Sequence, residues 1–481
     1  MSKDVLKGQE PAAVLRYFEE ICGIPHGSGN IGAISDYLVA FAVKQGLNYV
    51  QEPCGNVIIY ADATPGYENE PAVILQGHMD MVAVKDADCP IDMEKEGLSL
   101  FLKDGQVGAF GTSLGGDDGI AIAYALAILS DPGISHPRLE FLATVNEETG
   151  MDGASALDPS HLTARREINL DSEDEGILIA GCAGGLTLRL RMPLEREEST
   201  ADGLFEITVE GLLGGHSGTE IDKNRANAIL LLARTVAELK NTEQLRLISI
   251  SGGTKDNVIP NRATALVAAS RKPDVSTISK MLRGAYSGKE DGLTITVKEA
   301  DQAEGPALKP LTAESERKLL TLLQVLPFGP LTMSTLPGLV ETSDNVGIIR
   351  TTEEQAEIAV SVRSLIESEK EALCTRISLL AGLCGAKVSR NSEYPGWQYR
   401  LDSPIREKAV AAYREQYGEE PRVETIHAGL ECGLLIGKMP DLDAISLGPD
   451  IKGAHTTSER LDLASTARTW EILLRILAKR D

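Results

Sequence analysis

The pattern of hydrophobic and polar positions over residues 1–190 alternates between helical and strand periodicity. Apolar residues recur at helical spacing in some stretches, while short runs rich in β-branched residues are bounded by turn residues. Strands that alternate with helices are typical of an α/β domain with a mostly parallel sheet and helices on both faces. The pattern predicts helices at 10–22, 31–45 and 119–130 and strands at 56–60, 72–76, 138–145 and 167–170.

The rhythm changes after the apolar run at 177–192. A β-α-β-β pattern begins with FEITVEG, and a comparable series that begins with LTITVKEA follows it. After the turn-rich YPG at 394–396, helix and strand alternate again up to a C-terminal helix at about 460–479. We therefore predict an α/β domain in two parts, interrupted by an inserted α+β domain. The predicted boundaries are 1–190 and 394–481 for the first domain and 191–393 for the insertion.

Composition limits the partners and the compartment. The chain has 481 residues and a formal net charge of −24, so we expect two or more domains and no nucleic-acid or membrane partner. The same charge also fits simple solubility. The N-terminus has no apolar signal region, no segment approaches the ~18 apolar residues of a membrane span, and the seven scattered cysteines form no CxxC pair. A cytoplasmic protein with reduced thiols is the expectation.

Candidate chemistry is concentrated in five segments, most of which follow predicted strands. His78 and Asp80 lie in GHMD directly after the apolar run AVILQ, where ligands bind in open parallel sheets. Each segment alone has an ordinary explanation, such as a helix N-cap for an aspartate or a solvated loop for paired glutamates. The other candidates are Asp117 in GGDDG, Glu147 and Glu148 in NEETG, Asp171 in NLDSED and His455 in GPDIKGAH.

Taken together, two imidazoles and three carboxylates form a ligand set that suits zinc. Five ligands are too many for one tetrahedral ion but can serve two, and a carboxylate such as Asp117 can bridge ions ~3.5–4 Å apart. Such a pair of ions activates a water and polarises a carbonyl, while a neighbouring carboxylate without a metal acts as general base. The doublet of Glu147 and Glu148 can supply both a base and a ligand.

These motifs, in this order, resemble the co-catalytic zinc exopeptidases related to carboxypeptidase G and aminoacylase. Within that family the resemblance is closest to its dipeptidases, and it runs nearly end to end. The further segments that support it are IPHGSGN, GGHSGTEI, DNVIPNR, YPGW and HAGLECG. The resemblance implies two ligands for each zinc and one bridging ligand: His78 with Asp171, Glu148 with His455, and the bridging Asp117.

The resemblance also implies roles around the metal. Asp80 would orient His78 from behind. Glu147 would be the general base and later the proton donor to the leaving amine. The bridging aspartate of this family is often followed by Asn or Met, whereas Asp118 follows here. The choice of bridging carboxylate therefore stays open, with Asp117 preferred.

The inserted domain resembles the lid of this family. His216 in GGHSG would stabilise the tetrahedral oxyanion, and Asn257 and Arg363 match lid positions that hold substrate, with Arg363 suited to a carboxylate. Without the resemblance, the sequence fits a turn residue at His216 and a surface ion pair at Arg363 equally well. Glu431 in HAGLECG is expected to meet the amino group of the substrate. The remaining histidines are expected to be structural: His26, His136, His161 and His427.

The expected function is metal-dependent hydrolysis of dipeptides with broad specificity, and Xaa-His dipeptides are among the candidate substrates. The expected cofactors are two Zn²⁺ ions, with Co²⁺ or Mn²⁺ as substitutes, and a homodimer is compatible with the sequence. Two alternatives remain open: an N-acyl amino-acid deacylase with the same metal core, and a non-catalytic binding protein. The binding protein would usually have lost a ligand or the base, and neither is lost here.

Overall fold

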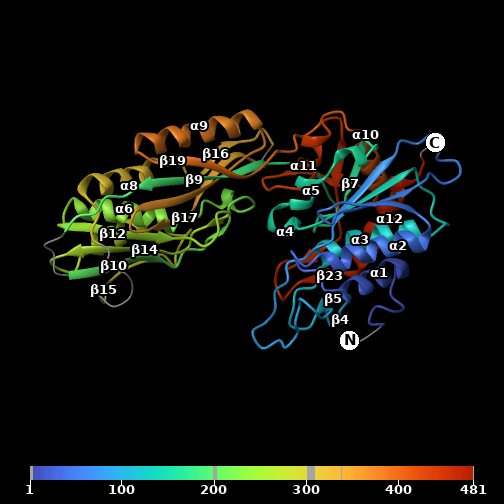
Figure 1. The fold of residues 1–481 in the computed structure, drawn as a ribbon, viewed down its shortest axis with the longest axis horizontal. Helices are drawn as coiled ribbons and strands as arrows, with labels where there is room; N and C mark the ends of the chain where they lie inside the picture. Colours follow the sequence, from blue (N-terminus) through green and yellow to red (C-terminus); the bar gives the residue numbers. More distant parts are fainter. Residues whose placement is uncertain (1–3, 199–202, 301–308, 337, 480–481) are drawn as a thin grey trace. The chain divides into compact units, whose positions relative to one another are not determined.

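The computed structural model describes residues 4–198, 203–300, 309–336 and 338–479. The chain divides into two compact units, each built from separate segments (Figure 1). Unit 1 comprises Met1–Gly181, Trp397–Thr425 and Leu430–Asp481, and unit 2 comprises Cys182–Gly396 and Ile426–Gly429.

An eight-stranded sheet forms the centre of unit 1. In sheet order, its strands are β1 (Asn48–Gln51), β2 (Val57–Ala61), β6 (Leu139–Thr144), β3 (Val73–His78), β7 (Arg166–Asn169), β21 (Asp443–Ser446), β8 (Ile177–Cys182) and β20 (Arg422–Ile426). The four strands β6, β3, β7 and β21 pair in parallel, whereas the pairs β1–β2, β2–β6 and β21–β8 are antiparallel. The α/β class is confirmed, and the parallel pairing expected for most of the sheet is found in its centre.

Apolar helices cover one face of this sheet. The helix α3 (Gly116–Ser130) is buried along nearly its whole length, because its sequence after the first turn, from Ile120 to Leu129, is apolar all round. It contacts β3 and α1 (Ala12–Cys22), and it shares a hydrophobic core with Leu75 and Phe141 of the sheet. The other helices of unit 1 are α2 (Gly32–Gln45), α4 (Glu147–Gly150), α5 (Asp152–Ala156), the 3-10 turn η1 (Pro159–His161), α10 (Pro404–Tyr417), α11 (Glu431–Lys438) and α12 (Leu463–Leu477).

The opposite face of the sheet carries several polar residues although it is buried. Because side chains alternate along a strand, Gln76 lies on the face opposite Leu75. Asn169 of β7 pairs with Gln76, so it shares this face. Glu140 and Glu167 both pair with Ile74, two residues before Gln76, so they lie on the same face as Gln76. Both glutamates are fully buried. This buried polar face was not predicted from the apolar runs of these strands.

A smaller antiparallel sheet in unit 1 supports the segment of His455. In order, its four strands are β22 (Ile451–Lys452), β23 (Arg460–Asp462), β5 (Gln106–Ala109) and β4 (Leu100–Lys103). His455 lies in the connection between β22 and β23, where its backbone adopts a left-handed φ of 63°. The positive φ marks a turn, and the chain reverses direction here because β22 and β23 are antiparallel.

Unit 2 is an antiparallel sheet of nine strands whose helices pack into one hydrophobic core. Its strands, in order, are β15 (Thr294–Glu299), β10 (Gly203–Glu210), β14 (Ala263–Ala269), β12 (Leu245–Gly252), β17 (Val340–Thr351), β18 (Gln355–Ser364), β9 (Gly184–Pro193) and β19 (Lys387–Tyr394), while β16 (Gly329–Met333) pairs with β17. This is the α+β architecture expected of the inserted domain. The remaining elements are α6 (Ala228–Lys240), α7 (Ser276–Ala285), α8 (Ala313–Val325), α9 (Glu367–Leu383), the 3-10 turn η2 (Ile221–Lys223) and a short ladder of β11 (Gly215–His216) with β13 (Val258–Ile259).

Strand β9 sets the first boundary between the units. It pairs with β18 along its whole length and also with β19, so unit 2 begins at Cys182 rather than at residue 191. The short segment 426–429 also belongs to unit 2, although it lies within the predicted second part of the first domain. The backbone N–H of Ala183 donates to the Ile426 carbonyl at 3.0 Å, which ties this segment to the sheet.

Two further expectations concern membrane spans and cysteines. Within the described ranges, no helix is both long and apolar enough to cross a bilayer. The same residues contain no disulfide. Burial raises the pKa of the Cys374 thiol to about 11, which disfavours the reactive thiolate.

Candidate active site

Parallel strands bring most of the candidate residues to one edge of the sheet in unit 1. His78 is the last residue of β3, Glu147 begins α4 just beyond β6, and Asp171 follows β7. Because these three strands run in parallel, their carboxyl ends lie at the same edge. Asp117 reaches this edge from the first turn of α3, and His455 reaches it from the turn between β22 and β23.

The Asp117 carboxylate lies between two imidazoles. Its Oδ1 is 3.0 Å from His78 Nε2, and its Oδ2 is 3.0 Å from His455 Nε2. A carboxylate that bridges two metal ions must direct its two oxygens in this way. Each imidazole has a second carboxylate, since Asp171 Oδ1 is 3.5 Å from His78 Nε2 and Glu148 Oε1 is 2.8 Å from His455 Nε2. The five residues thus form two groups of three that share Asp117.

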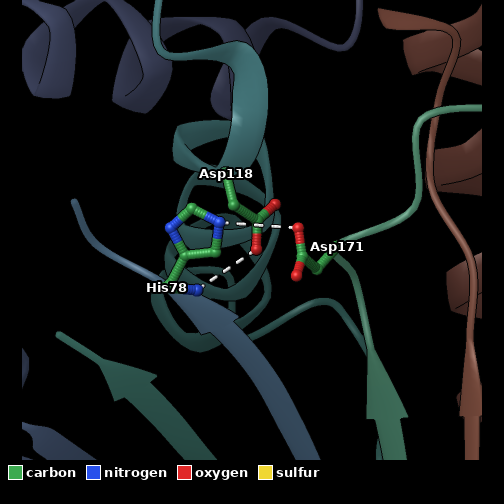
Figure 2. A group of neighbouring side chains, drawn as sticks. All are labelled: His78, Asp118 and Asp171. Atoms are coloured by element: carbon green, nitrogen blue, oxygen red, sulfur yellow. Dashed lines mark hydrogen bonds and ion pairs between the residues drawn. The ribbon is translucent and has the colours of Figure 1, made fainter. Parts of the chain in front are cut away.

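Asp118 belongs to the same cluster but has a different environment. Figure 2 shows its side chain at the start of α3, facing His78 and Asp171. The Asp118 Oδ2 accepts the backbone N–H of His78 at 3.2 Å, so this carboxylate caps the end of β3. Burial, and then the Asp171 carboxylate, raise the pKa of Asp118 well above its ordinary value and favour the neutral acid. The geometry therefore favours Asp117 over Asp118 as a bridge.

Negative charge exceeds positive charge in this cluster. Hydrogen bonds with Asp117 and Glu148 raise the pKa of His455 to about 11. Burial acts to lower the pKa of His78, but the carboxylates of Asp171 and Asp117 outweigh it and raise that pKa well above its ordinary value. Burial raises the pKa of Asp171 to about 6, although His78 opposes the shift. A site with this excess of carboxylates attracts cations, and imidazole nitrogens with carboxylate oxygens are donors that zinc accepts.

Asp80 contacts Nδ1 of the His78 ring, on the side away from the candidate metal site. His78 Nδ1 lies 2.9 Å from the Asp80 carbonyl oxygen, to which it can donate, and 3.6 Å from the Asp80 carboxylate. With the proton on Nδ1, Nε2 is the nitrogen available to a metal ion. The carboxylate of Asp80 is itself fixed, because it accepts the Ser28 hydroxyl at 2.8 Å and the backbone N–H of Glu147 at 3.0 Å.

Glu147 lies beside the candidate ligands. One ligand atom from each of Glu147, Glu148 and His78 falls within 4.8 Å of the others. Burial is the largest influence on Glu147 and raises its pKa well above the ordinary value, against the opposing effect of His78. A carboxyl group whose pKa is raised in this way can accept a proton from a water and later release it.

Glu431 is fully buried at the start of α11. Its Oε2 accepts hydrogen bonds from the side chains of Gln76 and Thr144, each at 2.6 Å, while its Oε1 has no hydrogen-bond partner among the described residues. Burial raises the pKa of Glu431 to about 7. The expected contact of Glu431 with the amino group of a substrate stays a prediction.

His216 lies in unit 2, at the end of the short strand β11. Its Nδ1 accepts the backbone N–H of Gly218 at 3.3 Å and of Thr219 at 3.2 Å, so the proton of the neutral ring is on Nε2. Burial, and then the charge of Arg363, lower the pKa of His216 to about 4. The neighbouring strand β13 pairs with β11, and the carbonyl oxygen of Asn257, just before it, accepts the Ser217 N–H at 2.9 Å.

Arg363 is a buried cation in strand β18 of unit 2. One guanidinium nitrogen donates to the Tyr394 hydroxyl at 2.6 Å, and its Nε has no hydrogen-bond partner within the described ranges. His427 was expected to be structural, and its Nε2 lies 2.7 Å from the Ser343 hydroxyl oxygen. Burial, and then the charge of Arg363, lower the pKa of His427 to about 3.

Three residues that contact the cluster were not predicted. Ser28 donates to Asp80, Gln76 donates to Glu431, and Glu459 contacts the backbone just before and at Asp117. Ser28 lies in IPHGSGN and Glu459 follows His455 in GAHTTSER, so both stand in segments that carried the family resemblance. Gln76 ends the apolar run AVILQ, and no periodic signal marks it.

Comparisons of this chain with a family model, with curated proteins and with solved structures all match peptidases. A family model described as peptidase family M20/M25/M40 matches residues 74–479. The cytosol non-specific dipeptidase of Escherichia coli strain K12 is 37% identical over 475 residues, which cover 97% of each chain. The structure of aminoacylhistidine dipeptidase from Vibrio alginolyticus matches with a TM-score of 0.85 and 33% identity over 99% of both chains. Aminopeptidase PepT from Bacillus cereus, at 18% identity and a TM-score of 0.58 over 98% of both chains, shares the fold.

Proposed function

This chain belongs to peptidase family M20/M25/M40, and we propose that it is a metal-dependent dipeptidase of broad specificity. The observation that carries the proposal is the position of Asp117 between His78 and His455, 3.0 Å from each imidazole. Two relatives whose names describe dipeptidases align with nearly the whole chain and support the same substrate class. We include Xaa-His dipeptides among the substrates.

We propose that the metal centre takes two zinc ions, with cobalt or manganese as substitutes. His78 and Asp171 would hold one ion, and Glu148 and His455 would hold the other. Asp117 would be a ligand of both ions. When bound, the ions supply Lewis acidity to the scissile carbonyl and lower the pKa of a water. The donor set supports this assignment, because two imidazoles and three carboxylates converge at contact distances.

The proton transfers are assigned to Glu147. Its raised pKa suits a group that takes the proton of the attacking water and then gives it to the leaving amine. Asp80 is a positioning residue, because it contacts His78 through Nδ1 and also accepts the backbone N–H of Glu147. Asp80 therefore holds both the ligand, through its backbone carbonyl, and the base, through its carboxylate.

Three residues of unit 2 are proposed to contact the substrate. His216 would donate its Nε2–H to the developing oxyanion, a role that suits a neutral ring whose Nδ1 already accepts backbone hydrogen bonds. Arg363 would bind the terminal carboxylate, since its guanidinium is only partly hydrogen-bonded within the described residues. Asn257 would hold the peptide beside His216. We also propose a cytoplasmic location and a homodimeric assembly.

The test is hydrolysis by metal-loaded protein of a dipeptide panel that includes Xaa-His peptides, with the matching N-acyl amino acids as comparison. We expect cleavage of dipeptides, its loss on chelation and its return with zinc, cobalt or manganese. Faster cleavage of N-acyl amino acids would identify a deacylase. Full dipeptidase activity in protein shown by elemental analysis to be metal-free would refute the metal assignment. Binding of dipeptides without turnover would identify a binding protein.

A further inference from the structure

The buried carboxylate of Glu459 accepts hydrogen bonds from four consecutive backbone N–H groups. Oε2 accepts from Leu114 at 2.7 Å and from Gly115 at 3.1 Å. Oε1 accepts from Gly116 at 2.8 Å and from Asp117 at 3.3 Å. The side chain is only 2% exposed, so these backbone groups, rather than water, satisfy the carboxylate.

This arrangement depends on the shape of the segment it holds. Gly115 has a left-handed φ of 67°, which turns the chain so that successive N–H groups converge on one anion. A Cβ at Gly116 would lie 3.2 Å from Glu459 Oε1, so the absence of a side chain there admits the carboxylate. Hydrogen bonds from N–H groups to a carboxylate are stronger than neutral ones. The backbone of Asp117 is therefore fixed by the carboxylate of Glu459.

The segment that carries Glu459 also carries His455. Strand β23 follows Glu459 directly, and its Leu461 pairs with Val107 of β5, so the carboxylate is attached to a sheet. On the other side of Glu459, the Thr457 hydroxyl donates to Asp86 at 2.7 Å. One short segment thus presents His455 to the Asp117 carboxylate and holds the Asp117 backbone.

We propose that Glu459 is a positioning residue that sets the distance between Asp117 and His455, and that it thereby sets the affinity of the centre for its metal pair. This inference rests on the metal centre of the proposed function. If Glu459 shifts, the two oxygens of Asp117 can no longer face both imidazoles at equal distance. Partners that orient metal ligands typically change metal affinity ~10–100-fold when they are replaced.

The experiment compares Glu459→Gln with Glu140→Gln. Glu140 is a matched control, because it is also fully buried in unit 1 and also accepts backbone N–H groups, those of Thr163 and Ala164. The zinc affinity of each metal-free protein is measured by competition with a chromophoric chelator. The visible absorption of the cobalt-loaded protein and the melting temperature of the metal-free protein are recorded for both variants.

We expect Glu459→Gln to lower zinc affinity ~10–100-fold and to change the cobalt spectrum. Glu140→Gln should lower the melting temperature but leave both metal readouts as in the wild type. Unchanged metal affinity and spectrum in Glu459→Gln would overturn the proposal, since a merely structural residue affects only stability. If Glu459→Gln fails to fold, Gly116→Ala displaces the same carboxylate more gently and must weaken zinc binding. Dipeptide turnover by the wild type is scored separately, so the failure of the proposed substrate class is distinguished from the failure of this inference.

Discussion

The Glu431 carboxylate accepts a hydrogen bond from the Gln76 side-chain amide at 2.6 Å, although the two residues are 355 positions apart in the chain. The Gln76 oxygen in turn accepts from the Asn169 amide, and the Asn169 oxygen accepts the backbone N–H of Asp171 at 3.3 Å. Because Glu431 Oε2 accepts from the Gln76 amide nitrogen, the Gln76 oxygen is left to accept from Asn169, and the orientation of both amides is fixed. The chain of hydrogen bonds therefore runs from α11 to a candidate metal ligand.

Removal of Glu431 should destabilise the fold itself. In Glu431→Ala, the buried Gln76 amide and Thr144 hydroxyl lose an acceptor, and we expect a loss of ~1–3 kcal/mol in the free energy of unfolding. Glu431→Gln keeps an acceptor oxygen, so it should lose less unfolding free energy than Glu431→Ala. Urea unfolding of the metal-free proteins measures both. If Glu431→Gln keeps full stability and raises KM only for substrates with a free amino group, Glu431 contacts the substrate instead.

The two carboxylates Glu147 and Asp171 should separate catalysis from metal binding. Glu147→Gln should keep its zinc and lose at least ~10²–10⁴-fold in turnover, because one group is expected to serve both proton transfers. Asp171→Ala should lose zinc, since a ligand is removed. Zinc content and kcat are measured on the same preparations. Near-normal turnover in Glu147→Gln would show that the two roles within the glutamate doublet are assigned wrongly.

His216→Ala should affect the transition state more than the ground state. A single oxyanion donor typically contributes ~10²–10³-fold to turnover, so kcat should fall by that factor while KM changes much less. Zinc content should be unaffected, because His216 lies in unit 2 and is not among the candidate ligands. Steady-state kinetics on one dipeptide are sufficient. A rise in KM alone would assign His216 to substrate binding.

Arg363→Ala should reduce the preference for a free terminal carboxylate. Loss of one partner of a buried charged contact is worth ~2–5 kcal/mol, so kcat/KM for a dipeptide should fall tens- to thousands-fold while its amide is less affected. Tyr394→Phe is the matched control, because it removes a hydrogen-bond partner of Arg363 but keeps the guanidinium. It should keep most of the difference between dipeptide and amide. Equal wild-type rates on a dipeptide, its amide and the matching tripeptide would refute the carboxylate contact.

Glu167 should make stability depend on pH. Burial raises its pKa to about 8 in the folded protein, from an ordinary value of 4.5. A raised pKa means that the folded state holds the proton more tightly, so this contribution to stability is complete below pH 4.5 and is lost as the pH rises towards 8. The Gln in Glu167→Gln resembles the neutral acid, so the stability of this variant relative to the wild type should increase as the pH rises over this range. Unfolding free energies of the metal-free proteins at about pH 5 and about pH 8 measure the gain, and a difference that is independent of pH would contradict the shift.

Sequence reasoning grouped His78, Glu148 and Asp171 because they lie at or just beyond the ends of strands. The carboxyl ends of parallel strands meet at one edge, so short motifs that follow β3, β6 and β7 indicate a shared site without any knowledge of pairing. The antiparallel pairing at the sides of the same sheet was not predicted, although the strand at 56–60 was. This pairing depends on partners far away in the chain, and local periodicity carries no record of those partners.

Polar residues in the interior were the second feature that could not be predicted from the sequence. Glu140, Glu167 and Asn169 lie in strands that also carry fully buried apolar residues, and a strand pattern alone does not distinguish a buried polar face from a solvated one. Glu459 was missed for a related reason. Its partners are backbone N–H groups, which every residue type except proline offers, so no side-chain motif in 114–117 indicates a carboxylate there.

The four residues 426–429 have a consequence for protein engineering. A chimera that exchanges unit 2 with a relative as one continuous cassette, 182–396, would leave this segment of the original chain behind. His427 would then face a foreign counterpart of Ser343, its partner at 2.7 Å. A complete exchange of unit 2 must therefore include both segments, and a swap designed from sequence continuity alone would separate them.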